Sequence, residues 1–219
     1  MKFDLDFIKT IYKIGFLLTL TLILVDLLTF FFYPNTVFSD IFLATREQTP
    51  LTWISALAFF FIALSCFAIY YKKKSNLWYL LSLTFFFFSV DDAVYMHERI
   101  SGFFVDNTSF LSSFPSYTWT IIYFPILAFS LFALLYIVWK DGSPKNKKMV
   151  VSALLILSIA VLLDFFEGLT EKDSVVFCFE KSCNLIVLHI MRLTEEVLEA
   201  FALGLLGYTN IVEHLINKK

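Results

Sequence analysis

Long runs of apolar residues follow one another along the chain, and short polar stretches separate them. A helix of about 20 apolar residues is long enough to cross the hydrocarbon core of a bilayer. We therefore predict an all-α, polytopic membrane helix bundle that forms one integral membrane domain over residues 1–219. The six transmembrane helices are expected at about 11–33, 51–71, 77–98, 118–139, 149–168 and 184–212.

The composition agrees with a membrane protein. Hydrophobic residues make up 59% of the chain and charged residues 16%, whereas soluble domains have about 45–50% and about 25%. The first apolar run is too long for the core of a signal peptide, and we expect it to remain as a helix. The net charge of −2 gives no reason to expect a nucleic-acid partner.

The placement of lysine and arginine predicts the orientation. Twelve lysines fall on one set of helix ends, namely Lys2, Lys9, Lys13, Lys72, Lys73, Lys74, Lys140, Lys145, Lys147, Lys148, Lys218 and Lys219. Four cations fall on the other side, namely Arg46, Arg99, Lys172 and Lys181. The positive-inside rule then places both termini in the cytoplasm of a cell, with the chain in a bacterial-type inner membrane.

Ionisable residues within the apolar runs are costly in a bilayer and indicate a functional site. These residues are Asp26, Asp91, Asp92, His97, Glu98, Asp164, Glu167, His189, Arg192, Glu195, Glu196 and Glu199. Asp26, Asp91 and Asp164 each lie about 12–15 residues from the cytoplasmic end of their helix, or roughly 20 Å at 1.5 Å per residue. The sixth helix brings its own ionisable residues to the same layer, so four helices are expected to meet there.

The helical faces support the same site. Residues three, four or seven apart share one face of a helix, and His189, Arg192, Glu196 and Glu199 have this spacing. In a purely structural interpretation, Arg192 pairs with Glu195 or Glu196 and ties helices together. One arginine cannot neutralise so many buried acids, so the cluster needs protons, water or a bound cation.

The ligand types favour a metal site. Di-iron and di-manganese bundles use four carboxylates and two histidines, and zinc accepts histidine and carboxylate with an activated water. We predict that one or two divalent ions (iron, manganese or zinc) are bound by residues from the set Asp91, Asp92, His97, Glu98, Asp164, Glu167, His189, Glu195 and Glu196. Arg192 would compensate charge, and Asp26 and Glu199 would be further buried acids.

Several functions remain open for such a site. Metal-dependent chemistry on a lipid-like substrate is one, and a proton- or cation-coupled transporter is another, because buried acids also serve ion relays. A third is a non-catalytic accessory subunit, either as a homo-oligomer or with a membrane-complex partner. Membrane lipid is the partner expected in every case.

The last loop before the sixth helix contains two cysteines, Cys178 and Cys183, in a C-x4-C spacing. On the outer side of the membrane this spacing favours a small disulfide. Free thiols and a metal or redox site are the alternatives.

Overall fold

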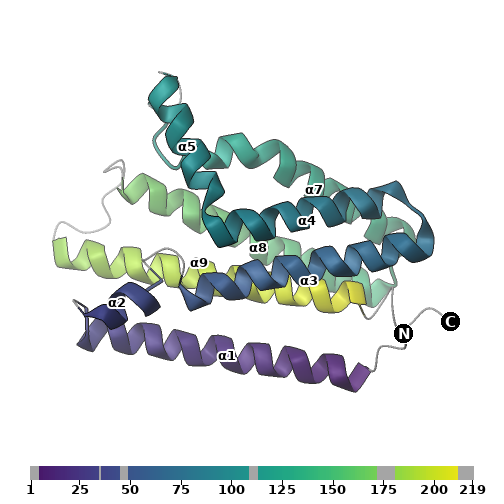
Figure 1. The fold of residues 1–219 in the computed structure, drawn as a ribbon, viewed down its shortest axis with the longest axis horizontal. Coiled ribbons are helices and arrows are strands. Elements are labelled where there is room, and N and C mark those ends of the chain that lie inside the picture. The colour runs from purple at the N-terminus through teal and green to yellow at the C-terminus, as the bar shows by residue number, and fades with distance from the viewer. Residues whose placement is uncertain (1–4, 35, 45–48, 109–112, 172–180, 212–219) are drawn as a thin grey trace.

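The computed structural model describes residues 5–34, 36–44, 49–108, 113–171 and 181–211. These residues form eight helices (Figure 1), which agrees with the predicted all-α fold. They are α1 (Leu5–Phe32), α2 (Val37–Phe42), α3 (Pro50–Lys73), α4 (Asn76–Val94), α5 (Met96–Asn107), α7 (Trp119–Asp141), α8 (Pro144–Glu171) and α9 (Lys181–Asn210).

Five of these helices are long and apolar enough to cross a membrane, which makes the chain a multi-pass membrane protein. The stretches are Asp6–Phe32, Pro50–Lys73, Asn76–Val94, Trp119–Lys140 and Pro144–Thr170. The sixth predicted span is present as the 30-residue helix α9. It does not belong to this apolar group, because Arg192 and three glutamates interrupt its sequence.

Local sequence signals set the ends of α3. Pro50 occupies the first turn, where the missing backbone N–H costs nothing. The hydroxyl oxygen of Thr49 accepts a hydrogen bond from the Thr52 amide at 3.4 Å and so caps the helix. Lys74 ends it in the left-handed conformation with φ 54°, and its amide donates to the Tyr70 carbonyl at 2.7 Å. The next helix, α4, can therefore fold back against α3 at once.

The third predicted helix is shorter than the sequence indicated. The helix was expected to continue to residue 98, but Tyr95 has a φ of 55° and separates α4 from α5. The amide of Tyr95 closes the end of α4 on the Asp91 carbonyl. Residues 96–107, predicted to lie partly in a loop, form α5, which projects from one end of the bundle (Figure 1).

The core lies where α3 packs against α4 and α9. Ile62, Cys66 and Leu81 have no exposed surface there. The Ser82 hydroxyl donates to the Ala63 carbonyl at 2.9 Å, which ties α4 to α3 inside this apolar contact. The long helix α8 runs beside α9, and α1 contacts α2, α3 and α9. Many other aliphatic and aromatic side chains face outward, as expected for surfaces in contact with lipid.

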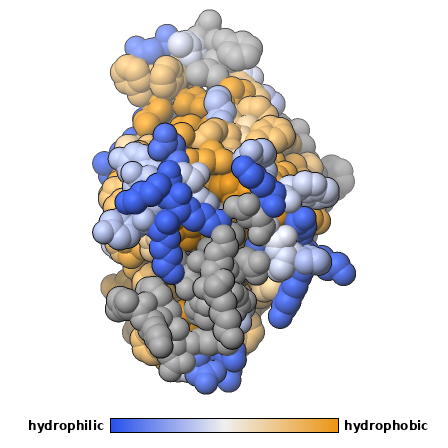
Figure 2. Space-filling model, turned by 90° about the vertical axis from the view of Figure 1, so that its right-hand side faces the viewer, coloured by the Kyte–Doolittle hydropathy of each residue, from blue (hydrophilic) through white to orange (hydrophobic). Residues whose placement is uncertain are grey.

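The lysine-rich segments that the structure describes share one end of the bundle. The turns between α3 and α4 and between α7 and α8 lie at the end where α1 begins and α9 ends (Figure 1). Figure 2 looks at this end and shows hydrophilic side chains gathered on it, with hydrophobic surface around them. Exposed lysines on these turns include Lys72, Lys74, Lys145 and Lys148.

Candidate functional site

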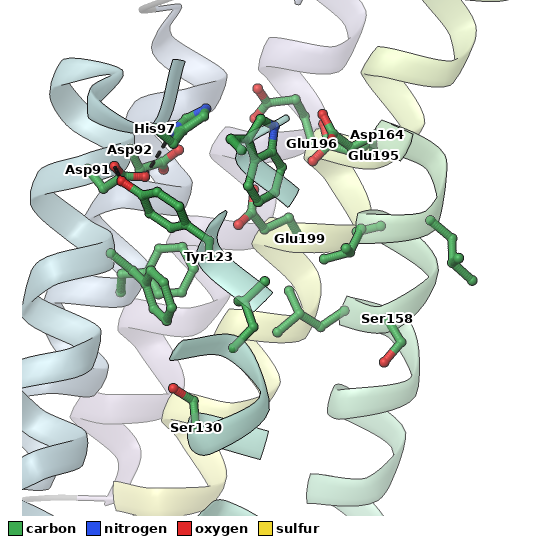
Figure 3. Close-up of a pocket in the computed structure, with 18 of the residues that line it drawn as sticks. Asp91, Asp92, His97, Tyr123, Ser130, Ser158, Asp164, Glu195, Glu196 and Glu199 are labelled. Atoms are coloured by element: carbon green, nitrogen blue, oxygen red, sulfur yellow. Dashed lines mark hydrogen bonds and ion pairs between the residues drawn. The ribbon is translucent and has the colours of Figure 1, made fainter. Parts of the chain in front are cut away.

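A cavity of about 590 Å³ lies among α3, α4, α5, α7, α8 and α9. Its upper part in Figure 3 is acidic, and the remainder is apolar down to Ser130 and Ser158. Asp91, Asp92 and His97 lie on one side of the acidic part (Figure 3). The α9 glutamates and Asp164 of α8 lie on the other side, so separate helices supply the two sides.

Eight of the nine residues predicted as metal ligands line this cavity. They are Asp91, Asp92, His97, Glu98, Asp164, Glu167, Glu195 and Glu196, and Arg192 and Glu199 join them. Among the described lining residues there are thus eight carboxyl groups and one guanidinium. A bilayer interior solvates charge poorly, so this imbalance is the main electrostatic feature of the site.

Asp91 holds the first side of the cavity together. The Tyr123 hydroxyl on α7 donates to Asp91 Oδ1 at 2.7 Å, and the other oxygen, Oδ2, lies 2.8 Å from His97 Nδ1. The left-handed turn at Tyr95 starts the new helix that carries His97. Asp91 therefore joins α4, α5 and α7, and its side chain is only 8% exposed.

Glu167 and Arg192 form the second contact of the site and join α8 to α9. The Arg192 guanidinium donates to Glu167 Oε1, and the Tyr117 hydroxyl donates to the same oxygen at 2.8 Å. The sequence considered Glu195 or Glu196 of the same helix as the partner, whereas this contact joins Arg192 to Glu167 of the neighbouring helix α8.

Gly168 allows the chain around Tyr117 to approach α8. A Cβ atom at Gly168 would lie 2.7 Å from the Tyr117 amide nitrogen, which is too close for any other residue. The neighbouring Ser116 hydroxyl donates to the Phe165 carbonyl at 2.7 Å. This close contact between the loop and the helix positions Tyr117 beside Glu167.

Other carboxylates in the cavity have unmet hydrogen-bonding capacity. Glu196 accepts a hydrogen bond from the Thr52 hydroxyl of α3 at 3.1 Å. Its other oxygen, Oε2, is buried without a hydrogen-bond partner among the described residues, as is Asp92 Oδ2. A buried carboxylate oxygen in this state costs free energy unless a proton, water or cation approaches it.

His189 does not belong to the cavity, and the expectation that it converges with the acids was wrong. Its Nε2 lies 2.7 Å from Asp26 Oδ1 in a contact between α9 and α1, and both side chains are 1% exposed. The imidazole stacks on Phe30, with ring centroids 3.9 Å apart. The Ala44 amide donates to Asp26 Oδ2 at 2.5 Å. Asp26 is thus buried as expected, but in a separate cluster.

The described acids and histidines do not form a ready-made metal site. No group of three or more His, Cys, Asp or Glu side chains among the described residues is arranged to hold a metal ion.

The predicted disulfide involves Cys178, which lies outside the described residues, and Cys183, whose side chain is likewise not described. Cys66 is a buried free thiol in the core.

Sequence reasoning missed the hydroxyl groups that contact the acids. Tyr117, Tyr123 and Thr52 each donate to a carboxylate in the cavity. A signal for Tyr123 was present, since it is a polar-tipped residue in an apolar helix near the expected level of the acids. Tyrosine also occurs in lipid-facing positions, so this signal alone does not distinguish a site residue.

The comparisons with known proteins give a family and no function. The chain matches the family described as Domain of unknown function (DUF8692) over residues 15–212. No curated protein and no solved structure matches it. The match covers most of the chain and includes every helix that lines the cavity, so the chain belongs to the DUF8692 family.

Proposed function

We propose that this membrane protein binds one or two divalent metal ions in the acidic part of its cavity. The observation that carries the proposal is the imbalance of eight carboxyl groups against the single guanidinium of Arg192 among the described lining residues. Arg192 already contacts Glu167. Asp92 and Glu196 each keep a buried oxygen without a hydrogen-bond partner among the described residues, and a divalent ion would supply compensating charge to both.

The side chains available for an ion are those that the hydrogen-bond network uses least. Asp92 and Glu196 each retain a buried oxygen without a partner. Glu195 and Glu199 lie on the same stretch of α9, and His97 adds an imidazole across the cavity. Carboxylate and imidazole together suit iron, manganese or zinc. Binding would draw these side chains together, because they do not share a common point in the arrangement described.

Transport is less well supported by the shape of the cavity. Below the acids the cavity is lined by apolar side chains such as Phe59, Phe85 and Leu134. An ion leaving the acids toward the lysine-rich end would meet no further carboxylate on the described wall. An accessory subunit without a ligand would give no role to the buried oxygens of Asp92 and Glu196, which have no hydrogen-bond partner among the described residues and are costly in a bilayer.

We also propose that α9 is a sixth transmembrane helix, with both termini in the cytoplasm. α9 runs beside α3 and α8, both of which are apolar enough to span (Figure 1). Its charged residues Arg192, Glu195, Glu196 and Glu199 all line the cavity. Charges that face a cavity are compatible with a span.

The metal content of purified protein tests the proposal. Wild-type protein, isolated without chelator, should contain stoichiometric iron, manganese or zinc by inductively coupled plasma mass spectrometry. Glu199→Gln removes one lining carboxylate and should lower the affinity for that metal about tenfold or more. Asp106→Asn removes an exposed acid of α5 outside the cavity and serves as the matched control. Wild-type protein that remains metal-free after incubation with each ion would reject the proposal.

A further inference from the structure

The larger part of the cavity is apolar and extends away from the acids. We call this part the apolar arm and define it by Phe59, Phe85, Leu131, Leu134, Leu154 and Leu157, which line it. These side chains come from α3, α4, α7 and α8. Ser130 and Ser158 lie along it in Figure 3, and Leu134 and Leu154 line it about one helical turn farther from the acids. A metal ion uses none of this space, so the apolar arm requires a separate explanation.

The cavity opens on the flank formed by α7 and α8. Phe124 and Phe132 of α7 line the cavity and are nevertheless 67% and 68% exposed. Leu162 of α8 also lines it and is 55% exposed. Both helices are apolar enough to span a membrane. The opening between them therefore faces the hydrocarbon of the bilayer, where water and polar solutes are scarce and lipid chains are abundant.

We propose that the apolar arm binds the hydrocarbon chain of a membrane amphiphile, which enters between α7 and α8 and places its polar end at the acidic part. The cavity has the same gradient of polarity as such a molecule, with carboxylates at one end and aliphatic and aromatic side chains along the rest. Its volume of about 590 Å³ lies within the range of roughly 300–1,000 Å³ of ligand pockets in proteins. The proposal goes beyond metal binding and does not depend on it.

The charge of the site restricts the headgroup. When no cation is bound, the lining carboxyl groups repel an anionic head, so a fatty acid then binds less well than an uncharged molecule with the same chain. Hydroxyl or amine heads donate hydrogen bonds, and the buried oxygens of Asp92 and Glu196 accept them. The ligand class is thus a long-chain amphiphile with an uncharged or cationic, hydrogen-bond-donating head.

Photo-crosslinking of the full-length protein in phosphatidylcholine vesicles tests the proposal. The probe is a long-chain fatty alcohol with a diazirine at the middle of the chain, and mass spectrometry identifies the labelled residues. Labels are expected on inward residues such as Leu131 and Leu157, and excess unlabelled fatty alcohol should remove them. Leu157→Trp fills the apolar arm and should reduce this labelling about tenfold, which corresponds to about 1.4 kcal/mol of lost binding. Leu155→Trp places the same side chain on an exposed position of α8 and should not.

Further measurements separate this proposal from metal binding. Labelling by the fatty alcohol should persist in the presence of a chelator and in Glu199→Gln. With the chelator present, a diazirine fatty acid of the same chain length should label more weakly. Labels confined to exposed residues would overturn the proposal. Labels that unlabelled alcohol does not remove would also overturn it, as would equal labelling of Leu157→Trp and Leu155→Trp. Equal labelling by the fatty acid would overturn the assignment of the headgroup. Protein that binds no metal but is still labelled would contradict the proposed function and would leave the proposal of a bound amphiphile standing.

Discussion

The hydroxyl of Tyr123 donates a hydrogen bond to Asp91 Oδ1 at 2.7 Å and thereby joins α7 to α4. Both side chains are buried, and Tyr123 is 3% exposed. α7 borders the cavity on its open side, so this contact helps to fix the width of the cavity. It also uses one oxygen of Asp91, while His97 uses the other. Asp91 is therefore better suited to a structural role than Asp92.

Removing the Tyr123 hydroxyl should destabilise the protein without disturbing the rest of the core. Tyr123→Phe leaves Asp91 Oδ1 buried without this donor, which costs about 1–3 kcal/mol. The unfolding temperature in detergent should fall relative to wild type. Tyr136→Phe, on the exposed part of the same helix, is the matched control and should unfold like wild type. Equal unfolding temperatures for all three proteins would contradict the assigned role.

Loss of Arg192 should be harsher than loss of its partner Glu167. Arg192→Met leaves Glu167 and its neighbours without the guanidinium, and breaking a buried pair in this way costs about 3–5 kcal/mol. Glu167→Gln leaves an arginine that other acids of the cavity can still attract. Thermal unfolding of Arg192→Met, Glu167→Gln and the double variant measures the two losses of stability and the coupling between them. The double variant should be more stable than Arg192→Met, and a double variant that is simply additive would refute the coupling.

Much of the fold follows from the hydrophobic pattern, because a bilayer imposes a length on each apolar run. The six predicted helices reappear as α1, α3, α4, α7, α8 and α9 with ends within a few residues, apart from the earlier start of α1 and α8 and the break at Tyr95. The break depends on one residue in the left-handed conformation, which a non-glycine residue adopts rarely. The pattern around Tyr95 remains helical on both sides, so periodicity could not reveal it.

The site was predicted in outline, because depth and face are periodic properties of a helix. Arg192, Glu196 and Glu199 lie on the predicted stripe and line the cavity, as does Glu195 beside the stripe. His189 is on the edge of the same stripe, since three residues turn a helix about 300°, roughly 60° short of a full turn from Arg192. Whether this edge of α9 faces the cavity or α1 depends on how α1 packs against α9. The sequence of α9 alone does not contain this information.

Accessibility mapping in intact cells tests the proposed orientation. Single cysteines are introduced as Ser75→Cys, between α3 and α4, and Thr108→Cys, after α5, in a variant without the natural cysteines. A membrane-impermeant maleimide should label position 108 from outside and position 75 only after permeabilisation, because the lysines near position 75 favour the cytoplasm. The reverse pattern would invert the orientation. A third cysteine, Ile211→Cys just after α9, should behave like position 75 if α9 spans the membrane.

The contact between Asp26 and His189 should stabilise the attachment of α1 to α9 and should have no effect on metal binding. His189→Ala removes the imidazole that lies 2.7 Å from Asp26 Oδ1 and stacks on Phe30. The buried carboxylate then loses its partner, which should cost about 3–5 kcal/mol if the two groups are charged in the folded protein. Asp26→Asn retains a group of similar size that can hydrogen-bond to His189, and the loss should be smaller. We expect a lower unfolding temperature for His189→Ala with the metal content of wild type, whereas Glu199→Gln should show lower metal content. A His189→Ala protein that unfolds like wild type but has lost its metal would instead make His189 a ligand, and would require α9 to present a different face to the cavity.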